Sequence, residues 1–265
     1  YTFTDGNGCV NSASDDKEVF ALPVITFTAP ADLCVDAGVQ SALGGGLPVG
    51  GVYSGAGVTD DGNGMTYSFD PAVAGSGVHT ISYSYTDGNG CSDTPATDDI
   101  EVFALPVVTL TAPADLCIDV GVQTALGGGL PTGGVYAGPG VTDDGNGMTY
   151  SFDPASAGIG VHILTYTFTD GNGCTSSDTD DIEVFALPTV TFTAPVDCCV
   201  NDGALTGLGG GTPTGGVYSG PGVTDDGNGM TYSFDPATAG VGVHTLTYTF
   251  TDGNGCVNSA SDDKE

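Results

Sequence analysis

The sequence contains almost no positive charge. Its 265 residues include two lysines, Lys17 and Lys264, and no arginine, against 33 aspartates and glutamates, so the formal net charge is −31. A protein that binds nucleic acid or an anionic membrane surface needs basic side chains to meet phosphate groups. The composition therefore argues against both partners and instead favours divalent cations, or simply high solubility.

Tryptophan is absent, and no apolar run approaches the roughly 18 residues of a membrane-spanning helix. Carbohydrate-binding modules usually present an exposed aromatic platform, whereas the tyrosines and phenylalanines here mostly fall on apolar-facing positions of expected strands. No Asn-x-Ser/Thr sequon occurs, so that form of glycosylation is not indicated. No signal peptide is visible, but this absence indicates little, because residue 1 falls in the middle of a repeat.

What the sequence does contain is a repeat. The stretch YTFTDGNGC at 1–9 returns at 83–91, with Ser84 and Tyr85 inside it, and again at 166–174 and 248–256. The nearly constant period between these copies indicates a tandem array of one small folding unit. We divide the chain into the C-terminal part of a preceding repeat (1–20), repeat 1 (21–103), repeat 2 (104–185) and repeat 3 (186–265), whose last strand is truncated.

Residues 1–18 are identical to residues 248–265, whereas the corresponding segments of repeats 1 and 2 diverge after the cysteine. Lys17 and Lys264 are therefore one position seen twice. We infer that the chain is a window on a longer array.

Short apolar alternations between Gly- and Pro-containing turns predict strands, and no helical period is present. Strands are expected at 24–28, 33–43, 65–69, 79–85 and 98–103, and the three aspartates that precede proline are expected to start turns: Asp70, Asp153 and Asp235. About seven strands per repeat predict an all-β fold of tandem immunoglobulin-like β-sandwiches of about 82–83 residues. The junction Glu-Val-Phe-Ala-Leu-Pro has little slack, so we expect an extended rod.

Each repeat carries one cysteine near its second expected strand and another after the Asp-Gly-Asn-Gly turn, always at the same separation. This fixed offset predicts one disulfide per repeat and an oxidising compartment, and each bond should add about 4 kcal/mol. The predicted pairs are Cys34–Cys91, Cys117–Cys174 and Cys199–Cys256. Reduced buried cysteines are the alternative, and zinc is less favoured because no compact Cys/His spacing exists.

Two cysteines fall outside this scheme. Cys9 is expected to bond to a cysteine upstream of the sequence. Cys198 stands where the other repeats have Leu33 and Leu116, and we expect either a buried free thiol or an intermolecular bridge.

Two acidic motifs are candidate calcium sites. The turn motif, Asp-Asp-Gly-Asn-Gly, is oxygen-rich like part of a calcium loop but lacks the closing glutamate of an EF-hand. The junction motif, Asp-Asp-x-Glu, could bind calcium and lock neighbouring repeats together. The alternative for both is a solvated acidic surface. The candidate ligands of the turn motif are Asp60, Asp61, Asn63, Asp143, Asp144, Asn146, Asp225, Asp226 and Asn228, and those of the junction motif are Asp98, Asp99, Glu101, Asp180, Asp181 and Glu183.

No catalytic constellation is evident. His79, His162 and His244 are one position seen three times, and no nucleophile with a base accompanies them. We therefore expect a protein that is not an enzyme.

The runs GGGLPTGGVYAGPGV (127–141), YSFDPASAG (150–158) and GVHILTYTFTDGNGC (160–174) resemble an immunoglobulin-like/PKD-like repeat. This repeat is common in very large surface proteins of Bacteroidota-type bacteria, including gliding adhesins exported by type IX secretion. The resemblance implies the same three within-repeat disulfides, an extracellular location and no catalytic residues. The chain departs from the pattern in its longer Asp-Asp-Gly-Asn-Gly turn and in the near-identity of its repeats.

The main hypothesis is a non-enzymatic extracellular stalk or fibre of a cell-surface adhesin, serving adhesion or surface motility. A self-assembling extracellular filament is the first alternative, and an array of carbohydrate-binding modules is the second. The expected partners are neighbouring repeats, other copies in a filament and an unidentified surface or glycan ligand, with calcium as the one candidate cofactor.

Overall fold

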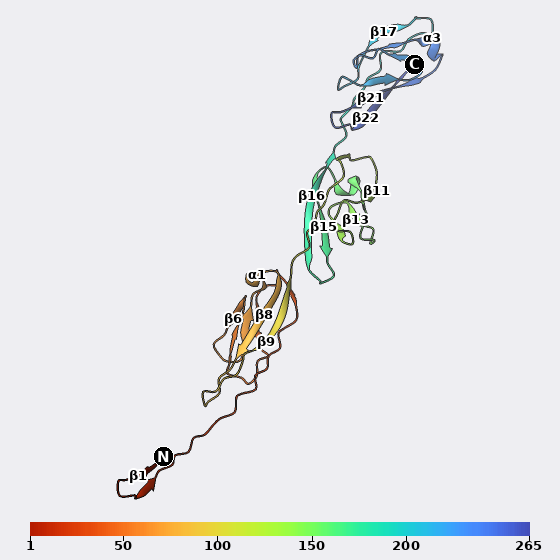
Figure 1. Cartoon of the computed structure of the whole chain (residues 1–265). Coiled ribbons are helices and arrows are strands. Elements are labelled where there is room, and N and C mark those ends of the chain that lie inside the picture. The colour runs from red at the N-terminus through yellow and green to blue at the C-terminus, as the bar shows by residue number, and fades with distance from the viewer. The chain divides into compact units, whose positions relative to one another are not determined.

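The computed structural model describes residues 1–265 and contains three tandem immunoglobulin-like sandwiches, one in each of repeats 1 to 3 (Figure 1). In repeat 1 a four-stranded sheet, in the order β3-β9-β8-β5, is accompanied by a three-stranded sheet, β4-β7-β6. Its elements are β3 (Leu33–Cys34), β4 (Gln40–Leu43), β5 (Val52–Ser54), β6 (Val58–Asp60), β7 (Tyr67–Phe69), α1 (Pro71–Ala74), β8 (Gly77–Ser84) and β9 (Ala96–Phe103). The predicted all-β fold is confirmed.

Repeat 2 has the same two sheets, β10-β16-β15-β12 and β11-β14-β13. Its elements are β10 (Leu116–Cys117), β11 (Gln123–Leu126), β12 (Val135–Ala137), β13 (Val141–Asp143), β14 (Tyr150–Phe152), α2 (Pro154–Ala157), β15 (Gly160–Thr169) and β16 (Thr175–Phe185). Repeat 3 has two three-stranded sheets, β18-β21-β22 and β17-β20-β19. Its elements are β17 (Leu205–Leu208), β18 (Val217–Ser219), β19 (Val223–Asp225), β20 (Tyr232–Phe234), α3 (Pro236–Ala239), β21 (His244–Thr251) and β22 (Val257–Lys264).

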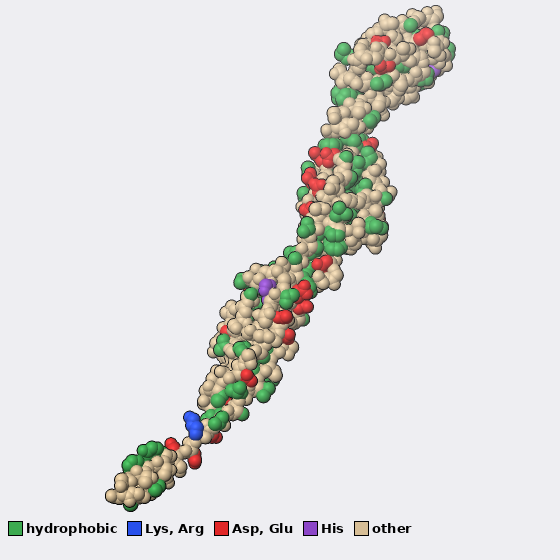
Figure 2. Space-filling view, in the orientation of Figure 1, with side chains coloured by type: hydrophobic (Ala, Val, Ile, Leu, Met, Phe, Trp, Pro, Cys, Tyr) green, Lys and Arg blue, Asp and Glu red, His purple; other side chains and the backbone are tan.

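The chain begins with an exposed hairpin. Strands β1 (Thr2–Thr4) and β2 (Val10–Ser12) pair antiparallel, and every residue of both is exposed. The chain divides into two compact units, residues 1–106 with 170–175, and residues 107–169 with 176–265. The helices are single turns, so none could cross a lipid bilayer. Acidic side chains are visible on each sandwich, and in repeats 1 and 2 they gather mainly along one side of it (Figure 2).

Two expected strands differ in the structure. The segment 24–28 makes only one bridge, in which Thr26 and Leu47 exchange backbone hydrogen bonds of 2.9 and 2.8 Å. Ile25 and Phe27 still pack against the core, so these two side chains share one face although no ladder forms. The segment 33–43 is two strands in different sheets, because a turn closed by the Ala37 N–H donating to the Cys34 carbonyl redirects the chain. The expected Asp-Pro turns are one-turn helices, each capped by its aspartate.

The long hairpin of each sandwich fixes where the cysteines lie. In β8 and β9, which run side by side (Figure 1), Gly77 pairs with Val102 and Tyr83 with Ala96. Strand β3 runs parallel to β9, with Cys34 beside Phe103. Cys34 therefore lies at the opposite end of β9 from the Asp-Gly-Asn-Gly turn that precedes it.

Three tyrosines form the centre of each core. In repeat 2 the ring of Tyr136 lies 4.5 Å, centroid to centroid, from those of Tyr150 and Tyr166. The Tyr166 hydroxyl donates to the Pro131 carbonyl at 2.6 Å and accepts from the Gly134 N–H at 2.8 Å. The same hydrogen bonds recur around Tyr83 and Tyr248. This tyrosine ties the Gly-rich loop to the centre of the sheet.

The glycines of that loop leave room for the tyrosine ring. A Cβ on Gly129 would lie 2.5 Å from the Tyr166 ring, and one on Gly134 would lie 2.4 Å from the Thr167 carbonyl oxygen. Real Cβ atoms do not approach so closely, so packing requires a glycine on each side of Leu130 and Pro131.

Repeat 3 differs from the other two by a buried charge. Lys264, in β22, is fully buried where repeats 1 and 2 have Ile100 and Ile182. Its amine donates to the Val196 carbonyl and lies over the Phe234 ring. The amine therefore has both a hydrogen-bond acceptor and an aromatic face as partners in the core.

Each repeat contains buried tyrosine hydroxyls with and without hydrogen bonds, which allows a direct comparison. Replacing the bonded tyrosines in all three repeats (Tyr83→Phe, Tyr166→Phe, Tyr248→Phe) should lower the free energy of unfolding by about 1–3 kcal/mol per repeat, because a buried glycine N–H loses its acceptor. The matched control replaces Tyr67, Tyr150 and Tyr232, whose buried hydroxyls have no hydrogen-bond partner. The control should be neutral or stabilising. Urea denaturation followed by circular dichroism measures both, and equal losses would contradict the assignment.

The same control triple tests pH dependence. Burial raises the pKa of Tyr67, Tyr150 and Tyr232 to about 12, from 10.0. Because the folded-state pKa is the higher one, the stabilisation is complete below pH 10 and is lost as the pH rises from 10 towards 12. We expect the urea midpoint to fall over that window, and to fall less in the Tyr67→Phe, Tyr150→Phe, Tyr232→Phe variant. An identical fall in both proteins would contradict this.

Candidate functional site

The cysteines that bond do so between successive repeats. Cys34 of repeat 1 bonds to Cys174, which follows the Asp-Gly-Asn-Gly turn of repeat 2, and Cys117 of repeat 2 bonds to Cys256 of repeat 3. The Cα atoms are 5.6 Å apart in both bonds, and the partners are 140 and 139 residues apart in sequence. Each bond lies within one of the two compact units, because residues 170–175 belong to the unit that contains repeat 1.

This pattern corrects the predicted pairs Cys34–Cys91, Cys117–Cys174 and Cys199–Cys256. In repeat 1 the two cysteines lie at opposite ends of strand β9, because Cys91 precedes the strand and Cys34 lies beside its last residue. Strand β9 has eight residues, which span about 25 Å at roughly 3.3 Å per residue. A disulfide requires Cα atoms within about 7 Å of each other, so Cys34 cannot reach Cys91.

The second cysteine of each bond is presented by a turn built from its own sequence. The Asp170 carboxylate accepts hydrogen bonds from the backbone N–H groups of Asn172 and Cys174, both at 2.9 Å. The Gly173 N–H closes the turn on the Asp170 carbonyl at 3.1 Å. Asp252 holds Cys256 in the same way. Both bonded cysteines of these turns are buried, Cys174 at 1% and Cys256 at 0% exposure.

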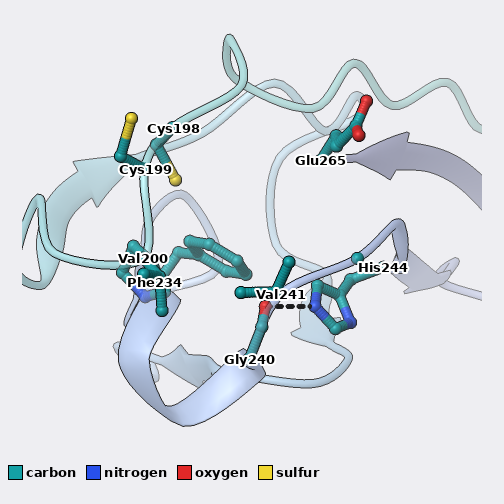
Figure 3. Close-up of a pocket in the computed structure, with 10 residues that line it drawn as sticks. Cys198, Cys199, Val200, Phe234, Gly240, Val241, His244 and Glu265 are labelled. Atoms are coloured by element: carbon teal, nitrogen blue, oxygen red, sulfur yellow. Dashed lines mark hydrogen bonds between the residues drawn. The ribbon is translucent and has the colours of Figure 1, made fainter.

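Four cysteines remain unpaired. They are Cys9, Cys91, Cys198 and Cys199. Cys198 packs half-buried against the core of repeat 3 (Figure 3). The expectation of a buried free thiol or an intermolecular bridge at this position stays a prediction. Cys9 and Cys199 are exposed, and Cys91 is half-buried.

The turn motif uses its oxygens within the fold. In repeat 2 the Asp143 carboxylate accepts from the N–H groups of Tyr136 and Gly145, both at 2.8 Å. Asp144 accepts from the Thr149 hydroxyl at 2.6 Å, and the Asn146 side-chain oxygen accepts from the Met148 and Thr149 N–H groups. The equivalent residues of repeats 1 and 3 make the same bonds: Asp60, Asp61, Asn63, Asp225, Asp226 and Asn228.

The junction motif also serves the fold. Asp180 accepts from the Ala112 N–H at 2.8 Å, and this bond, with one from the Asp181 N–H, lowers the pKa of the Asp180 carboxyl. In repeat 1 Asp98 accepts from the Ala29 N–H, and Asp99 accepts from the Thr80 hydroxyl. The Glu101 and Glu183 N–H groups donate to the aspartates that precede β3 and β10. No three His, Cys, Asp or Glu side chains converge on a metal-sized site. Calcium binding by either motif stays a prediction.

Each histidine links a helix end to the strand that follows. The His162 Nε2–H donates to the Gly158 carbonyl at 2.7 Å, and His79 and His244 make the equivalent bond. The hydrogen bond positions the turn between α2 and β15.

No protein-family model and no curated protein matches the chain. Solved structures do match it. One is a Ca²⁺-stabilised adhesin that helps an Antarctic bacterium reach out and bind ice, at 17% identity over 99% of this chain and 79% of that one, with a TM-score of 0.45. A 1.5-MDa bacterial ice-binding adhesin matches at 15% identity over 88% and 92%, with a TM-score of 0.35. Mouse cadherin-23 domains EC22–24 match at 11% identity over 91% and 95%, with a TM-score of 0.33.

A protease site at a repeat junction tests the pairing. We expect a chain cut between Ala104 and Val107 to stay together on a non-reducing gel, because Cys34–Cys174 joins the two fragments, and to separate when reductant is added. The Cys34→Ser variant, cut at the same site, is the control and should separate without reductant. Separation of the oxidised parent chain would contradict the pairing and restore the within-repeat bonds.

Proposed function

We propose that the chain is a load-bearing, non-enzymatic segment of an extracellular stalk, as in a large bacterial cell-surface adhesin. The observation that carries the proposal is the staggered pair of disulfides, Cys34–Cys174 and Cys117–Cys256. Each joins one repeat to the next, so the repeats are tied to one another by a bond besides the backbone.

The staggering matters under tension. The loop closed by Cys34–Cys174 and the loop closed by Cys117–Cys256 share residues 117–174. A pulling force can therefore pass through the first disulfide, along residues 117–174, and through the second disulfide. The junctions between repeats lie inside these loops and are shielded from stretching even if a sandwich opens. A disulfide inside each repeat would leave every junction under load.

Other features support the extracellular location. Disulfides persist in oxidising compartments, outside the cytosol. A net charge of −31 gives solubility to an exposed repeat. The resemblance of the sequence to surface-protein repeats points the same way, and it is the only support for a role in gliding or for type IX export.

The tyrosines favour a structural role over glycan binding. Three tyrosines recur in every repeat, and they are buried in the core: in repeat 2 they are Tyr136, Tyr150 and Tyr166. The exposed aromatic side chains, Tyr1, Phe3 and Phe20, all lie before repeat 1. An array of carbohydrate-binding modules is therefore the weaker candidate.

Single-molecule stretching tests the proposal. The measurement uses a chain with Cys9, Cys91, Cys198 and Cys199 replaced by serine, so that Cys117–Cys174 is the one within-repeat bond that can still compete with the two observed bonds. The shortest covalent path through the two observed bonds comprises residues 1–34, 117–174 and 256–265, about 100 residues, which extend to about 350 Å at roughly 3.4 Å per residue. The reduced chain of 265 residues should extend to about 900 Å.

The Cys34→Ser, Cys117→Ser variant of that protein is the matched control and should reach the reduced length under oxidising conditions. A within-repeat Cys117–Cys174 bond would instead leave about 210 residues, or about 700 Å. If the oxidised parent reached about 700 or about 900 Å, the staggered bonds would carry no load and the proposal would be wrong.

A further inference from the structure

The tetrapeptide Asp-Gly-Asn-Gly occurs twice in every repeat. In repeat 2 it stands at 144–147, within the turn motif, and again at 170–173, directly before Cys174. The same two residues precede the asparagine in both copies and the same glycine follows it, so the sequence gives the two asparagines the same intrinsic chemistry. The fold gives them different surroundings.

The chemistry is the loss of ammonia from an asparagine that precedes glycine. The backbone nitrogen of the glycine attacks the side-chain carbonyl carbon, the bond from that carbon to the amide nitrogen breaks, and the proton of the attacking nitrogen leaves with the amide as ammonia. Water opens the resulting cyclic succinimide at either carbonyl, which gives aspartate or isoaspartate. Asparagine is for this reason a thermolabile residue, and glycine has no side chain to hinder the attack.

Asn146 is held away from this reaction by three hydrogen bonds. Its side-chain oxygen accepts from the Met148 and Thr149 N–H groups at 2.7 and 2.8 Å, and its side-chain nitrogen donates to the Thr149 hydroxyl at 2.7 Å. The following glycine is fixed as well, because the Gly147 carbonyl accepts from the Gly133 N–H at 2.6 Å. The asparagine side chain cannot turn towards the Gly147 nitrogen until its own bonds break.

Asn172 is free to react. Both asparagines of repeat 2 are exposed, but the side-chain amide of Asn172 makes no hydrogen bond. The Gly173 nitrogen gives up one bond when it attacks, the 3.1 Å bond to the Asp170 carbonyl. Asn89 and Asn254, the equivalent residues of repeats 1 and 3, are likewise exposed with unbonded side chains.

The turn around Asn172 also presents a cysteine that joins two repeats. The Asp170 carboxylate accepts from the N–H groups of Asn172 and Cys174, so the backbone path between these two nitrogens sets the shape of the turn. In isoaspartate the backbone runs through the former side chain, which adds one methylene group to that path. The new carboxylate also places a negative charge near Asp170, and like charges at close range repel.

We propose that Asn172 deamidates spontaneously in the folded chain while Asn146 is protected, and that the isoaspartate formed loosens the turn that presents Cys174. The Cys34–Cys174 disulfide, whose turn cysteine is 1% exposed, thereby becomes accessible to reductants. This goes beyond the proposed stalk role, because the site ages whether or not the chain bears load.

Peptide mapping of the whole chain tests the difference between the two asparagines. The four unpaired cysteines are replaced by serine, so that no free thiol exchanges with the disulfides during incubation in mildly alkaline buffer. Chymotrypsin, which cleaves after aromatic residues, then gives the two asparagines in peptides of different sequence, 137–150 and 169–185. We expect the mass gain of deamidation to appear at least about tenfold faster at Asn172 than at Asn146, since Asn146 must break more hydrogen bonds.

The same chain, reduced and unfolded in urea, is the control for intrinsic reactivity. Both asparagines should then deamidate at the same rate, because their immediate neighbours are identical. Equal rates in the folded chain, or a faster reaction at Asn146, would overturn the proposal.

A variant removes part of the protection without touching Asn172. Thr149→Val keeps a branched side chain but removes the hydroxyl that bonds the Asn146 side-chain nitrogen. Deamidation of Asn146 should become several-fold faster, and that of Asn172 should not change. An unchanged rate at Asn146 would contradict the proposed protection.

Reduction kinetics test the effect on the disulfide. The Asn172→Ser variant cannot form the succinimide. After equal ageing, dithiothreitol should reduce Cys34–Cys174 several-fold faster in the parent than in this variant, while Cys117–Cys256 should react equally in both proteins. Alkylation of the released thiols followed by mass spectrometry reports each bond separately. Equal reduction of Cys34–Cys174 in the two aged proteins, with isoaspartate present in the parent, would overturn the loosening of the turn.

Discussion

One buried tyrosine per repeat fixes the arrangement of the sandwich. Its hydroxyl joins the Gly-rich loop to the central strand, through Gly134 and Pro131 in repeat 2. Ordering the glycines of the loop costs entropy, but a side chain at either flanking glycine would strike the ring or the neighbouring backbone. The strand after the loop, β12, pairs with β15 of the long hairpin, so the loop is fixed against that hairpin. The same hairpin has Cys117 beside its last residue, Phe185, and Cys174 at its turn.

The cross-links between repeats follow from this placement. The strand cysteine lies beside the last residue of the long hairpin, where the chain leaves the repeat, and the turn cysteine lies at the other end of the same hairpin. Within one repeat the two are too far apart to bond, yet each is correctly placed for a neighbour. The two-residue strands β3 and β10 thus place their cysteines so that disulfides form between successive repeats and not within one repeat.

The sequence predicts the sandwich well because its information is local and repeated. Alternation at His79 to Tyr85 and at Asp98 to Phe103 gives the hairpin, and the Asp-Pro steps give the turns. The disulfide partners are not predictable in this way. In a repeated sequence, bonds within one repeat and bonds between successive repeats both give a nearly constant separation, and the observed separations are 140 and 139 residues. The deciding signal is the parallel pairing of β3 with β9, which two residues of sequence cannot reveal. The acidic motifs are conspicuous in the sequence, but their oxygens serve neighbouring backbone and hydroxyl groups.

The buried lysine of repeat 3 makes the three sandwiches unequal. An isoleucine, as at Ile100 and Ile182, needs no polar partner in a core, whereas the amine of Lys264 is costly to bury and depends on the Val196 carbonyl. Lys17 shows that the same residue returns after three repeats. Along an array of this kind, every third sandwich would be the weakest, so thermal opening would begin at regularly spaced points instead of at random.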